Sequence, residues 1–278
     1  MNCENALELM NRELDENEKA IKEGGKAAEE SGNKFQNFGK VLKTVGVALG
    51  AVAAAAGAAA VKLGKEVVAA YADYEQLVGG IDTLFKDSSQ EIQRYAANAY
   101  KTAGISANEY METVTGFSAS LIQSLGGDTE KAVKYADMAI TDMADNANKM
   151  GTDISSIQTA YQGFAKQNYT MLDNLKLGYG GTKQEMERLL ADSEKISGVK
   201  YDISSYADVV EAIHTMQESM DIAGTTAKEA EATISGSVSA LKSAVSNLIV
   251  GFGDADADME LLCSNMVDAF KTVVANIT

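Results

Sequence analysis

The single histidine, His214, is the residue on which ordinary imidazole acid–base or metal chemistry would have to depend. It lies between Ile213 and Thr215 in a segment with helical spacing of apolar residues, and neither a second histidine nor a nearby cysteine accompanies it. A serine–histidine–acid triad would therefore have to be built around this one side chain. We expect His214 to be a surface or partly packed residue of a helix.

Three aspartates at alternate positions, Asp254, Asp256 and Asp258, have the spacing with which a calcium-binding loop begins. The remainder of such a loop does not follow. Its sixth position is Met259, where the sharp turn needs glycine, and its twelfth is Asn265, where a bidentate glutamate belongs. We interpret the three carboxylates as an acidic helix start, which interacts favourably with the helix dipole.

Glycine, threonine and lysine occur together in the segment 178–183, Gly-Tyr-Gly-Gly-Thr-Lys, as they do in phosphate-binding loops. A P-loop, however, has four residues between its glycines and follows a buried strand. The segment before this one is polar and helical in pattern. We interpret the glycines as a chain reversal before a helix that Thr182 caps.

Other residues of chemical interest have no informative spacing. The chain has 40 Asp and Glu residues, so some pair of carboxylates will always have a separation that suits glycoside hydrolysis. The presence of such a pair therefore does not indicate a glycosidase. Cys3 and Cys263 form no C-x-x-C motif, which argues against a zinc site or a disulfide framework. The sequence predicts no catalytic residue, no cofactor and no metal site, and hence a protein that is not an enzyme.

The elements that carry these residues are predicted to be helices, because the chain contains no proline. Average usage of about 5% would give roughly 14 prolines, and each costs about 3 kcal/mol inside a helix. Tryptophan is absent and phenylalanine occurs 7 times, so we expect a core of close helix contacts without large aromatic side chains.

The net charge of −16 argues against nucleic-acid binding through phosphates. The acidic N-terminus does not resemble a signal peptide.

An apolar ladder with a spacing of seven residues runs through the segment 1–43. Its members are Leu7, Leu14, Ile21, Ala28, Phe35 and Leu42. A strict repeat of seven keeps one stripe facing a partner helix, so the pattern predicts a coiled coil between copies of the chain. The alternative is an amphipathic helix that folds back onto its own domain.

An uncharged segment rich in alanine and glycine follows, within residues 44–64. It begins at Val45, ends at Val61 and carries Gly46, Gly50 and Gly57 at near-helical spacing. Its 17 residues include nine alanines and one leucine, so membrane insertion would be marginal. Close packing against another helix through small residues is the favoured interpretation, and a membrane-inserted helix is the alternative.

From residue 65 onward, helix start and stop signals alternate. The expected capping pairs are Ser88/Glu91, Ser106/Glu109, Thr182/Glu185, Ser205/Asp208 and Thr226/Glu229, and the expected stops are Gly104, Gly126, Gly127, Gly151, Gly198 and Gly224. The apolar spacing between these signals is helical, as in Val133, Ala136, Ala139, Ile140 and Met143, or in Val209, Val210, Ile213, Met216 and Met220. Only residues 199–203 alternate like a strand.

These patterns predict an all-α fold in which a long coiled-coil-like helix precedes a multi-helix bundle core. We expect the core domain to span residues 65–235. Amphipathic helices follow in residues 236–278, one of them broken at Gly251 and Gly253 and the last running from Met259 to Val274.

Three stretches of the chain resemble one protein family. They are Tyr-Ala-Asp-Tyr-Glu-Gln-Leu-Val-Gly-Gly-Ile-Asp-Thr-Leu-Phe from position 71, Gly-Phe-Ala-Lys-Gln-Asn-Tyr-Thr-Met-Leu-Asp-Asn-Leu-Lys-Leu-Gly-Tyr-Gly-Gly-Thr from position 163, and Glu-Met-Glu-Arg-Leu-Leu from position 185. This region resembles the core module of tape-measure proteins from long-tailed phages and prophages of Gram-positive bacteria. The similarity spans residues 71–252 and is most specific over residues 172–190.

The resemblance implies a structural protein of the virion, made in the bacterial cytoplasm, that acts in tail assembly, length determination and genome delivery. Its implied partners are further copies of itself, tail-tube and tail-tip proteins, and the host membrane at infection, without specific nucleic-acid binding. Members of the family are usually longer, so we expect a truncated or split product or a fragment. The rival functions are a membrane-active pore or translocon component that uses residues 45–61, and a peptidoglycan hydrolase.

Overall fold

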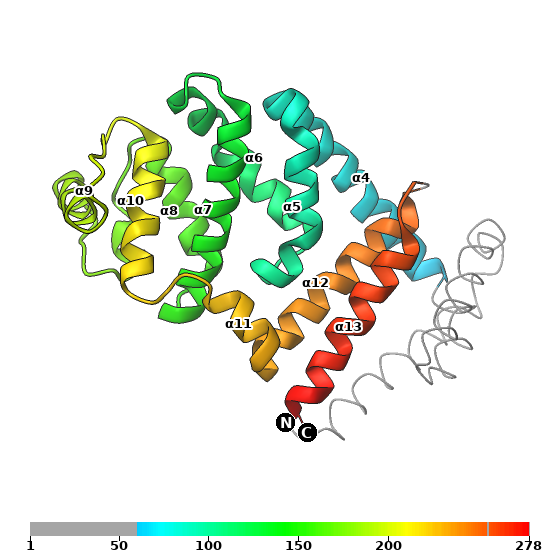
Figure 1. The fold of residues 1–278 in the computed structure, drawn as a ribbon. Helices are drawn as coiled ribbons and strands as arrows, with labels where there is room; N and C mark the ends of the chain where they lie inside the picture. Colours follow the sequence, from blue (N-terminus) through cyan, green and yellow to red (C-terminus); the bar gives the residue numbers. More distant parts are fainter. Residues whose placement is uncertain (1–59, 255, 278) are drawn as a thin grey trace. The chain divides into compact units, whose positions relative to one another are not determined.

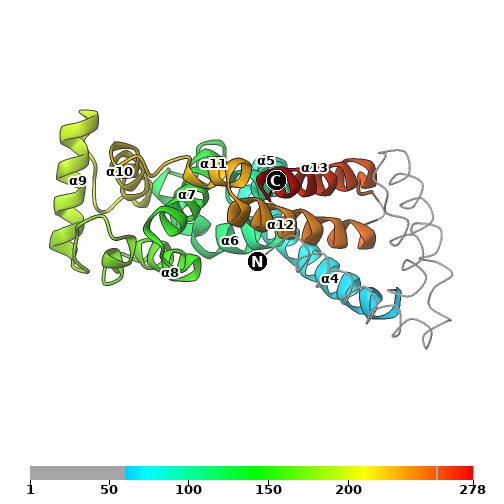
Figure 2. The ribbon, with the colours of Figure 1, turned by 90° about the horizontal axis from the view of Figure 1, so that it is seen from below.

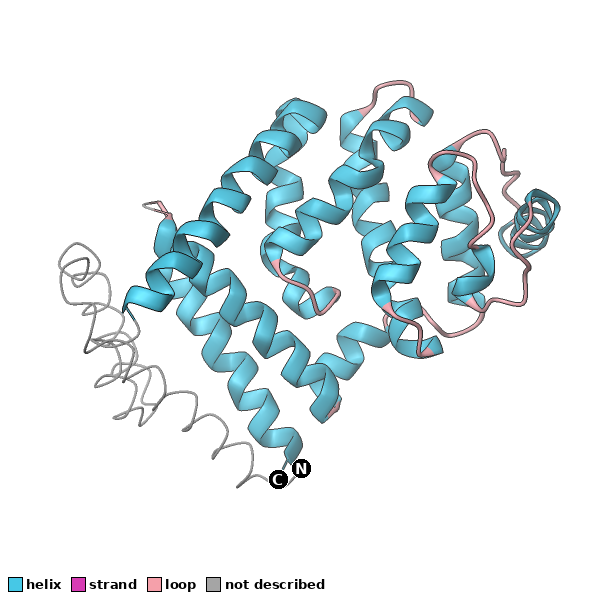
Figure 3. Cartoon of the chain, turned by 180° about the vertical axis from the view of Figure 1, so that it is seen from behind, coloured by secondary structure: helices cyan, strands magenta, loops and turns pink. Residues whose placement is uncertain are grey.

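The structure is a computed structural model that describes residues 60–254 and 256–277, with side chains from residue 69 onward. Every regular element within these residues is a helix and none is a strand, which confirms the all-α prediction (Figure 3). The predicted coiled-coil residues and small-residue glycines, Leu7, Leu14, Ile21, Ala28, Phe35, Leu42, Gly46, Gly50 and Gly57, lie outside the described residues.

Two compact units divide the described residues, and two long helices, α4 (Ala60–Phe85) and α12 (Ile234–Gly253), contribute to both. The larger unit contains residues 76–243. The smaller unit contains the beginning of α4, the second half of α12, and α13 (Met259–Ile277).

Helix α7 is the centre of the larger unit. The elements that follow α4 are η1 (Lys86–Ser88), α5 (Ser89–Thr102), α6 (Ala107–Ser124), α7 (Thr129–Met150), α8 (Ile154–Phe164), η2 (Leu172–Leu175), α9 (Lys183–Ser197), α10 (Tyr206–Ser219) and α11 (Thr225–Ala232). Helix α7 packs against α5, α6, α8, α10 and α11, and α9 packs against α10 (Figure 1).

The apolar spacing located the buried faces of these helices. All five apolar residues expected on one face of α7 are buried, as are the first four expected on α10. Met220 is an exception and is 39% exposed, because α10 ends at Ser219 and the chain leaves the helical path there. The expectation of a core without large aromatic side chains was wrong: Tyr100, Tyr110, Tyr161, Phe85, Phe117 and Phe164 are among the largest fully buried residues.

The predicted helix starts are correct where the side chain is free to turn back onto its own helix. Ser106 and Glu109 form a complete capping box at α6. Thr182 and Ser205 each accept the backbone N–H three residues ahead. Ser88 makes no capping bond, because its hydroxyl lies 3.0 Å from that of Thr129.

The prediction that Thr226 caps a helix was also wrong. Helix α11 begins at Thr225, directly after Gly224, so Thr226 lies inside the helix. For the same reason Gly224 does not stop a helix but precedes one. Gly151 and Gly198 do end α7 and α9 in the left-handed conformation, with φ of 61° and 74°. Asp128 and Asp153 cap α7 and α8 without having been predicted.

Glycines in α12 allow close helix packing within the smaller unit (Figure 2). A Cβ atom at Gly251 would lie 2.3 Å from Cδ1 of Leu262 in α13, and one at Gly253 would lie 2.5 Å from Cβ of Tyr71 in α4. The predicted break at Gly251 is therefore wrong, since α12 continues through it and ends at Gly253. Position 251 requires glycine because the neighbouring helix lies too close for a side chain, and no turn in the chain is needed to explain it. The last helix extends to Ile277, three residues beyond its predicted end.

Candidate functional site

His214 lies at the contact between α10 and α7 and is paired with an aspartate that the sequence did not single out. Its Nδ1 atom lies 2.9 Å from Oδ1 of Asp142, whose side chain is only 2% exposed, while the imidazole itself is 28% exposed. The sequence predicted a surface or partly packed histidine on a helix, and the structure shows the partly packed form. Its partner stands 72 residues away in the sequence, so no local spacing could have revealed it.

Asp142 belongs to a buried polar row on α7 that also contains Asp145 and Asn146. All three residues are buried, and their spacing of three and four residues places them along one side of the helix. The carboxylate of Asp145 accepts the backbone N–H of Gly224 at 2.5 Å and that of Thr226 at 2.7 Å. Asn146 donates to the carbonyl of Leu175 in η2 at 3.0 Å. Each of the three residues therefore binds a different segment of the chain.

Further hydrogen bonds join α10 to α7 and α8. The hydroxyl of Tyr135 on α7 donates to Oε2 of Glu211 at 2.6 Å, and that of Tyr206 donates to the carbonyl of Tyr161 at 3.2 Å. Gln217 donates to the hydroxyl of Tyr161 at 3.4 Å, while its Oε1 has no partner among the described residues. The surroundings of the Asp142–His214 pair are therefore polar and enclosed by three helices.

Burial and hydrogen bonding act together on the protonation of the pair. Burial raises the pKa of Asp142 to about 6, although the hydrogen bond from His214 opposes this shift. The same hydrogen bond raises the pKa of His214, and the carboxylates of Glu218 and Glu211 add to that effect. Both shifts have the same sign, so the folded protein holds protons at this pair more tightly than the unfolded chain does.

The pair lacks the geometry of a nucleophilic site. In a triad, the second imidazole nitrogen faces a serine or cysteine. Here Nε2 of His214 lies 3.4 Å from Oε1 of Glu218 on the same helix, and no hydroxyl or thiol of the described residues is hydrogen-bonded to the ring. The pair therefore joins two helices and is not set up to activate a nucleophile.

The glycine-rich loop before α9 is held by two side chains of that helix, Glu185 and Arg188. The carboxylate of Glu185 accepts the backbone N–H of Gly180 at 3.0 Å, and Arg188 donates to the carbonyl of Gly178 at 2.8 Å. The guanidinium of Arg188 also lies over the ring of Tyr179, 4.3 Å from its centre. Because a carboxylate already takes the Gly180 N–H, the loop does not form a phosphate-binding cradle, in agreement with its interpretation as a chain reversal.

The carboxylates before α13 serve the local backbone. Asp254 accepts the N–H of Asp256 at 3.0 Å, and Asp258 accepts that of Leu261 at 2.9 Å at the start of the helix. Within residues 60–254 and 256–277, no group of three or more His, Cys, Asp or Glu side chains is arranged to hold a metal ion. Cys263 is buried in the smaller unit, and Cys3 lies outside the described residues.

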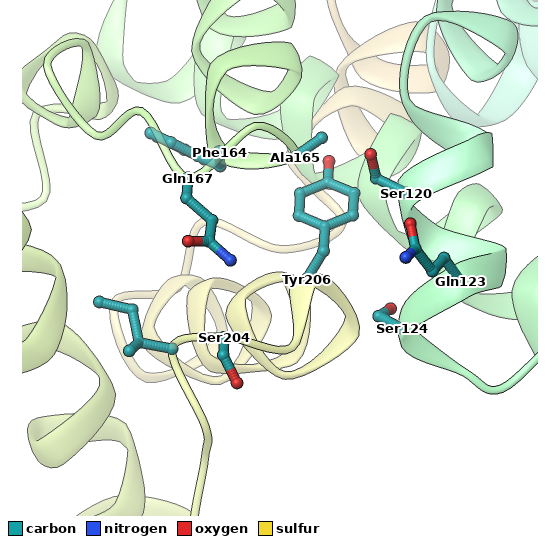
Figure 4. A pocket seen from close by; sticks show the side chains of 9 residues that line it. Ser120, Gln123, Ser124, Phe164, Ala165, Gln167, Ser204 and Tyr206 are labelled. Carbon is teal, nitrogen blue, oxygen red and sulfur yellow. The ribbon is translucent and has the colours of Figure 1, made fainter.

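A cavity of about 290 Å³ lies in the larger unit, between the ends of α6 and α8 and the start of α10 (Figure 4). Its lining is uncharged and consists of Ser120, Gln123, Ser124, Phe164, Ala165, Gln167, Ile203, Ser204 and Tyr206. Side chains of this kind offer hydrogen bonds and apolar contact, but no titratable pair for proton transfer at neutral pH.

Comparison of the chain with protein-family models, with curated proteins and with solved structures found no match. Among the helices of the described residues, none combines the length and the apolar character needed to cross a bilayer. Residues 45–59 of the apolar segment are not among those to which this finding applies.

Proposed function

We propose that this chain is part of a tape-measure protein of a long-tailed phage or prophage and acts as a structural component in tail assembly. The proposal starts from the sequence resemblance over residues 71–252. It includes self-association through the heptad ladder, contacts with tail-tube and tail-tip proteins, and a location in the virion.

One observation supports it: the most specific part of the resemblance is composed of residues that pack and cap. Residues 172–190 bury Leu172, Leu175, Leu177, Tyr179, Met186, Leu189 and Leu190. A Cβ atom at Gly181 would lie 2.2 Å from the backbone oxygen of Thr170, so the chain passes itself too closely there for any other residue. Lys176 donates to the carbonyl of Met150, the last residue of α7, and to that of Gly151, which follows the helix. A motif used in this way suits a structural protein better than an enzyme.

The test is genetic and structural, in the bacterial strain that carries the gene. Purified phage or prophage particles are digested and searched for peptides of this chain by mass spectrometry, and an in-frame deletion is examined by electron microscopy. We expect the peptides in tailed particles, and the deletion to abolish tails or change their length. Normal tails in the deletion strain would refute the proposal.

Complementation provides the matched control. A gene with Gly180→Ala should restore tails, because a Cβ atom at Gly180 meets only Cγ of Glu185 at 3.5 Å. A gene with Gly181→Ala should not restore them. Equal complementation by both variants would mean that the close packing of this loop is not required for tail formation.

The composition of residues 45–61 is the observation that favours a membrane-active protein instead. Flotation of the full chain with liposomes distinguishes the two functions. A tape-measure role that needs no insertion predicts that the chain stays in the aqueous fraction. Binding that is lost in an Ala54→Asp variant would favour the membrane-active alternative.

A further inference from the structure

The contact of α10 with α7 contains the only imidazole in the chain, and the carboxylate it meets is inside the protein. Helix α9 packs against α10, so the attachment of α10 to α7 also bears on the position of α9 (Figure 1). Of the bonds that join α10 to α7, the one between His214 and Asp142 has a titratable group on each side with its ordinary pKa below 7. This arrangement is independent of the proposed phage function.

The titratable groups that face the pair come from three helices of the larger unit. Among the described residues, Asp145 on α7 and Glu218 on α10 act on Asp142, whereas Glu211 and Glu218 act on His214. Tyr161 on α8 faces Asp142, and burial keeps its hydroxyl protonated well above neutral pH. The carboxylates favour a protonated pair, because each added negative charge makes removal of the proton from the imidazolium less favourable.

The direction of the pH effect follows from comparison with the unfolded chain. The folded pKa of His214 is raised, so its stabilising effect is complete below the unfolded value of about 6.5 and is lost as the pH rises through the folded value. The folded pKa of Asp142, about 6, is also above the ordinary value. The cost of burying its carboxylate therefore destabilises the folded state fully above that pH, and this destabilisation decreases as the pH falls toward about 4. Both groups therefore favour the folded state in mild acid and disfavour it in alkali, and the bond between imidazolium and carboxylate is lost as His214 gives up its proton.

We infer that Asp142 and His214 form a proton-dependent contact that holds α10, together with α9, against α7 and loosens as the proton is lost. With the proton present, an imidazolium donates to a buried carboxylate, which is a charge-assisted hydrogen bond. Without it, a buried carboxylate faces a neutral ring, and part of its cost of burial is no longer compensated. The remaining bonds between α10 and its neighbours persist, so α10 loosens without a general loss of the fold.

The first measurement is an NMR titration of the full chain, in which the single histidine produces a single set of imidazole signals. We expect the pKa of His214 to lie above about 6.5 in the native protein. A value at or below this would overturn the inference. The measurement needs no variant, so it decides the question even if a substitution at Asp142 prevents folding.

The second measurement is hydrogen exchange of the α10 amides between about pH 6 and pH 9, corrected for the intrinsic effect of pH on exchange. The protection of α10 should fall by about tenfold for each unit by which the native pKa of His214 exceeds its value in unfolded chains. In Asp142→Asn, the side chain keeps its shape and an acceptor but loses its charge. We expect the pKa of His214 to drop and the pH dependence of protection to flatten in this variant.

Glu211→Gln is the matched control, because it weakens a different bond between the same two helices, that from Tyr135. It should lower the protection of α10 at every pH while keeping most of the slope. If Asp142→Asn and Glu211→Gln show the same pH dependence as the native chain, the contact is a structural hydrogen bond only and the inference is wrong.

Discussion

The carboxylate of Asp145, in the middle of α7, accepts the backbone N–H of Thr226 at 2.7 Å and so caps a helix that lies 81 residues further along the chain. The same carboxylate accepts the N–H of Gly224. Asp145→Ala leaves two backbone donors without an acceptor, each of which costs about 1 to 3 kcal/mol when buried. We expect the free energy of unfolding to fall by at least about 2 kcal/mol, measured by urea denaturation.

Asp128→Ala provides the comparison for this variant. Asp128 also caps a helix, but it does so at a solvent-exposed site, where its carboxylate accepts the backbone N–H of Lys131 and pairs with the ammonium group of the same residue. Asp128→Ala should therefore lower the free energy of unfolding clearly less than Asp145→Ala does. Equal losses for the two variants would mean that the buried position of Asp145 and its second hydrogen bond contribute nothing.

Gly181→Ala should destabilise the protein much more than Gly180→Ala, although the two residues are adjacent. A methyl group at Gly181 would lie 2.2 Å from the backbone oxygen of Thr170, and backbone cannot turn aside as a side chain can. We expect a loss of about 1 to 3 kcal/mol, typical of overpacking, or failure to fold. Thermal unfolding followed by circular dichroism measures both variants, and similar melting temperatures would contradict the close approach.

Cys263 should be unreactive in the native protein. It is 1% exposed, and burial raises the pKa of its thiol to about 11, so only about 0.1% would be thiolate at pH 8. In a Cys3→Ser variant it is the sole thiol of the chain, and its alkylation can be followed by mass spectrometry. We expect labelling within minutes in denaturant and negligible labelling without it; rapid labelling of the native chain would show that the packing of α13 opens readily.

The heptad ladder predicts self-association that depends on the N-terminal segment. Light scattering of the full chain and of a chain lacking residues 1–64 measures this directly. A multimer that becomes a monomer on truncation is the expected result. A monomer in both cases would mean that the ladder packs within its own chain, and the proposed function would then depend on the family resemblance alone.

Sequence reasoning was most successful where the relevant interactions are local. The capping box of Ser106 and the stops at Gly151 and Gly198 depend on residues within a few positions, and the structure confirms them. The apolar faces of α7 and α10 follow from a spacing of three and four residues, which the sequence displays. The seven-residue ladder stays a prediction, because it lies outside the described residues.

The candidate site was not predictable by the same means. Asp142 and His214 meet across 72 residues, and nothing near Asp142 distinguishes it from the many acidic residues of a helical surface. Ser88 shows the same limitation in reverse: its local pattern is that of a cap, but its hydroxyl bonds to Thr129 on another helix. A contact of this kind depends on how helices pack, which the spacing within one helix does not contain.

The buried polar row also constrains how the chain can be made. Asp145 needs donors that are synthesised 81 residues later, which corresponds to roughly 4 to 16 s at a typical ribosomal rate of about 5 to 20 residues per second. During that interval α7 carries carboxylates that only the completed domain can bury favourably. In nascent chains that end between residues 146 and 223, the side of α7 that carries Asp145 should therefore stay in solvent, exposed to chaperones and proteases, until α11 emerges.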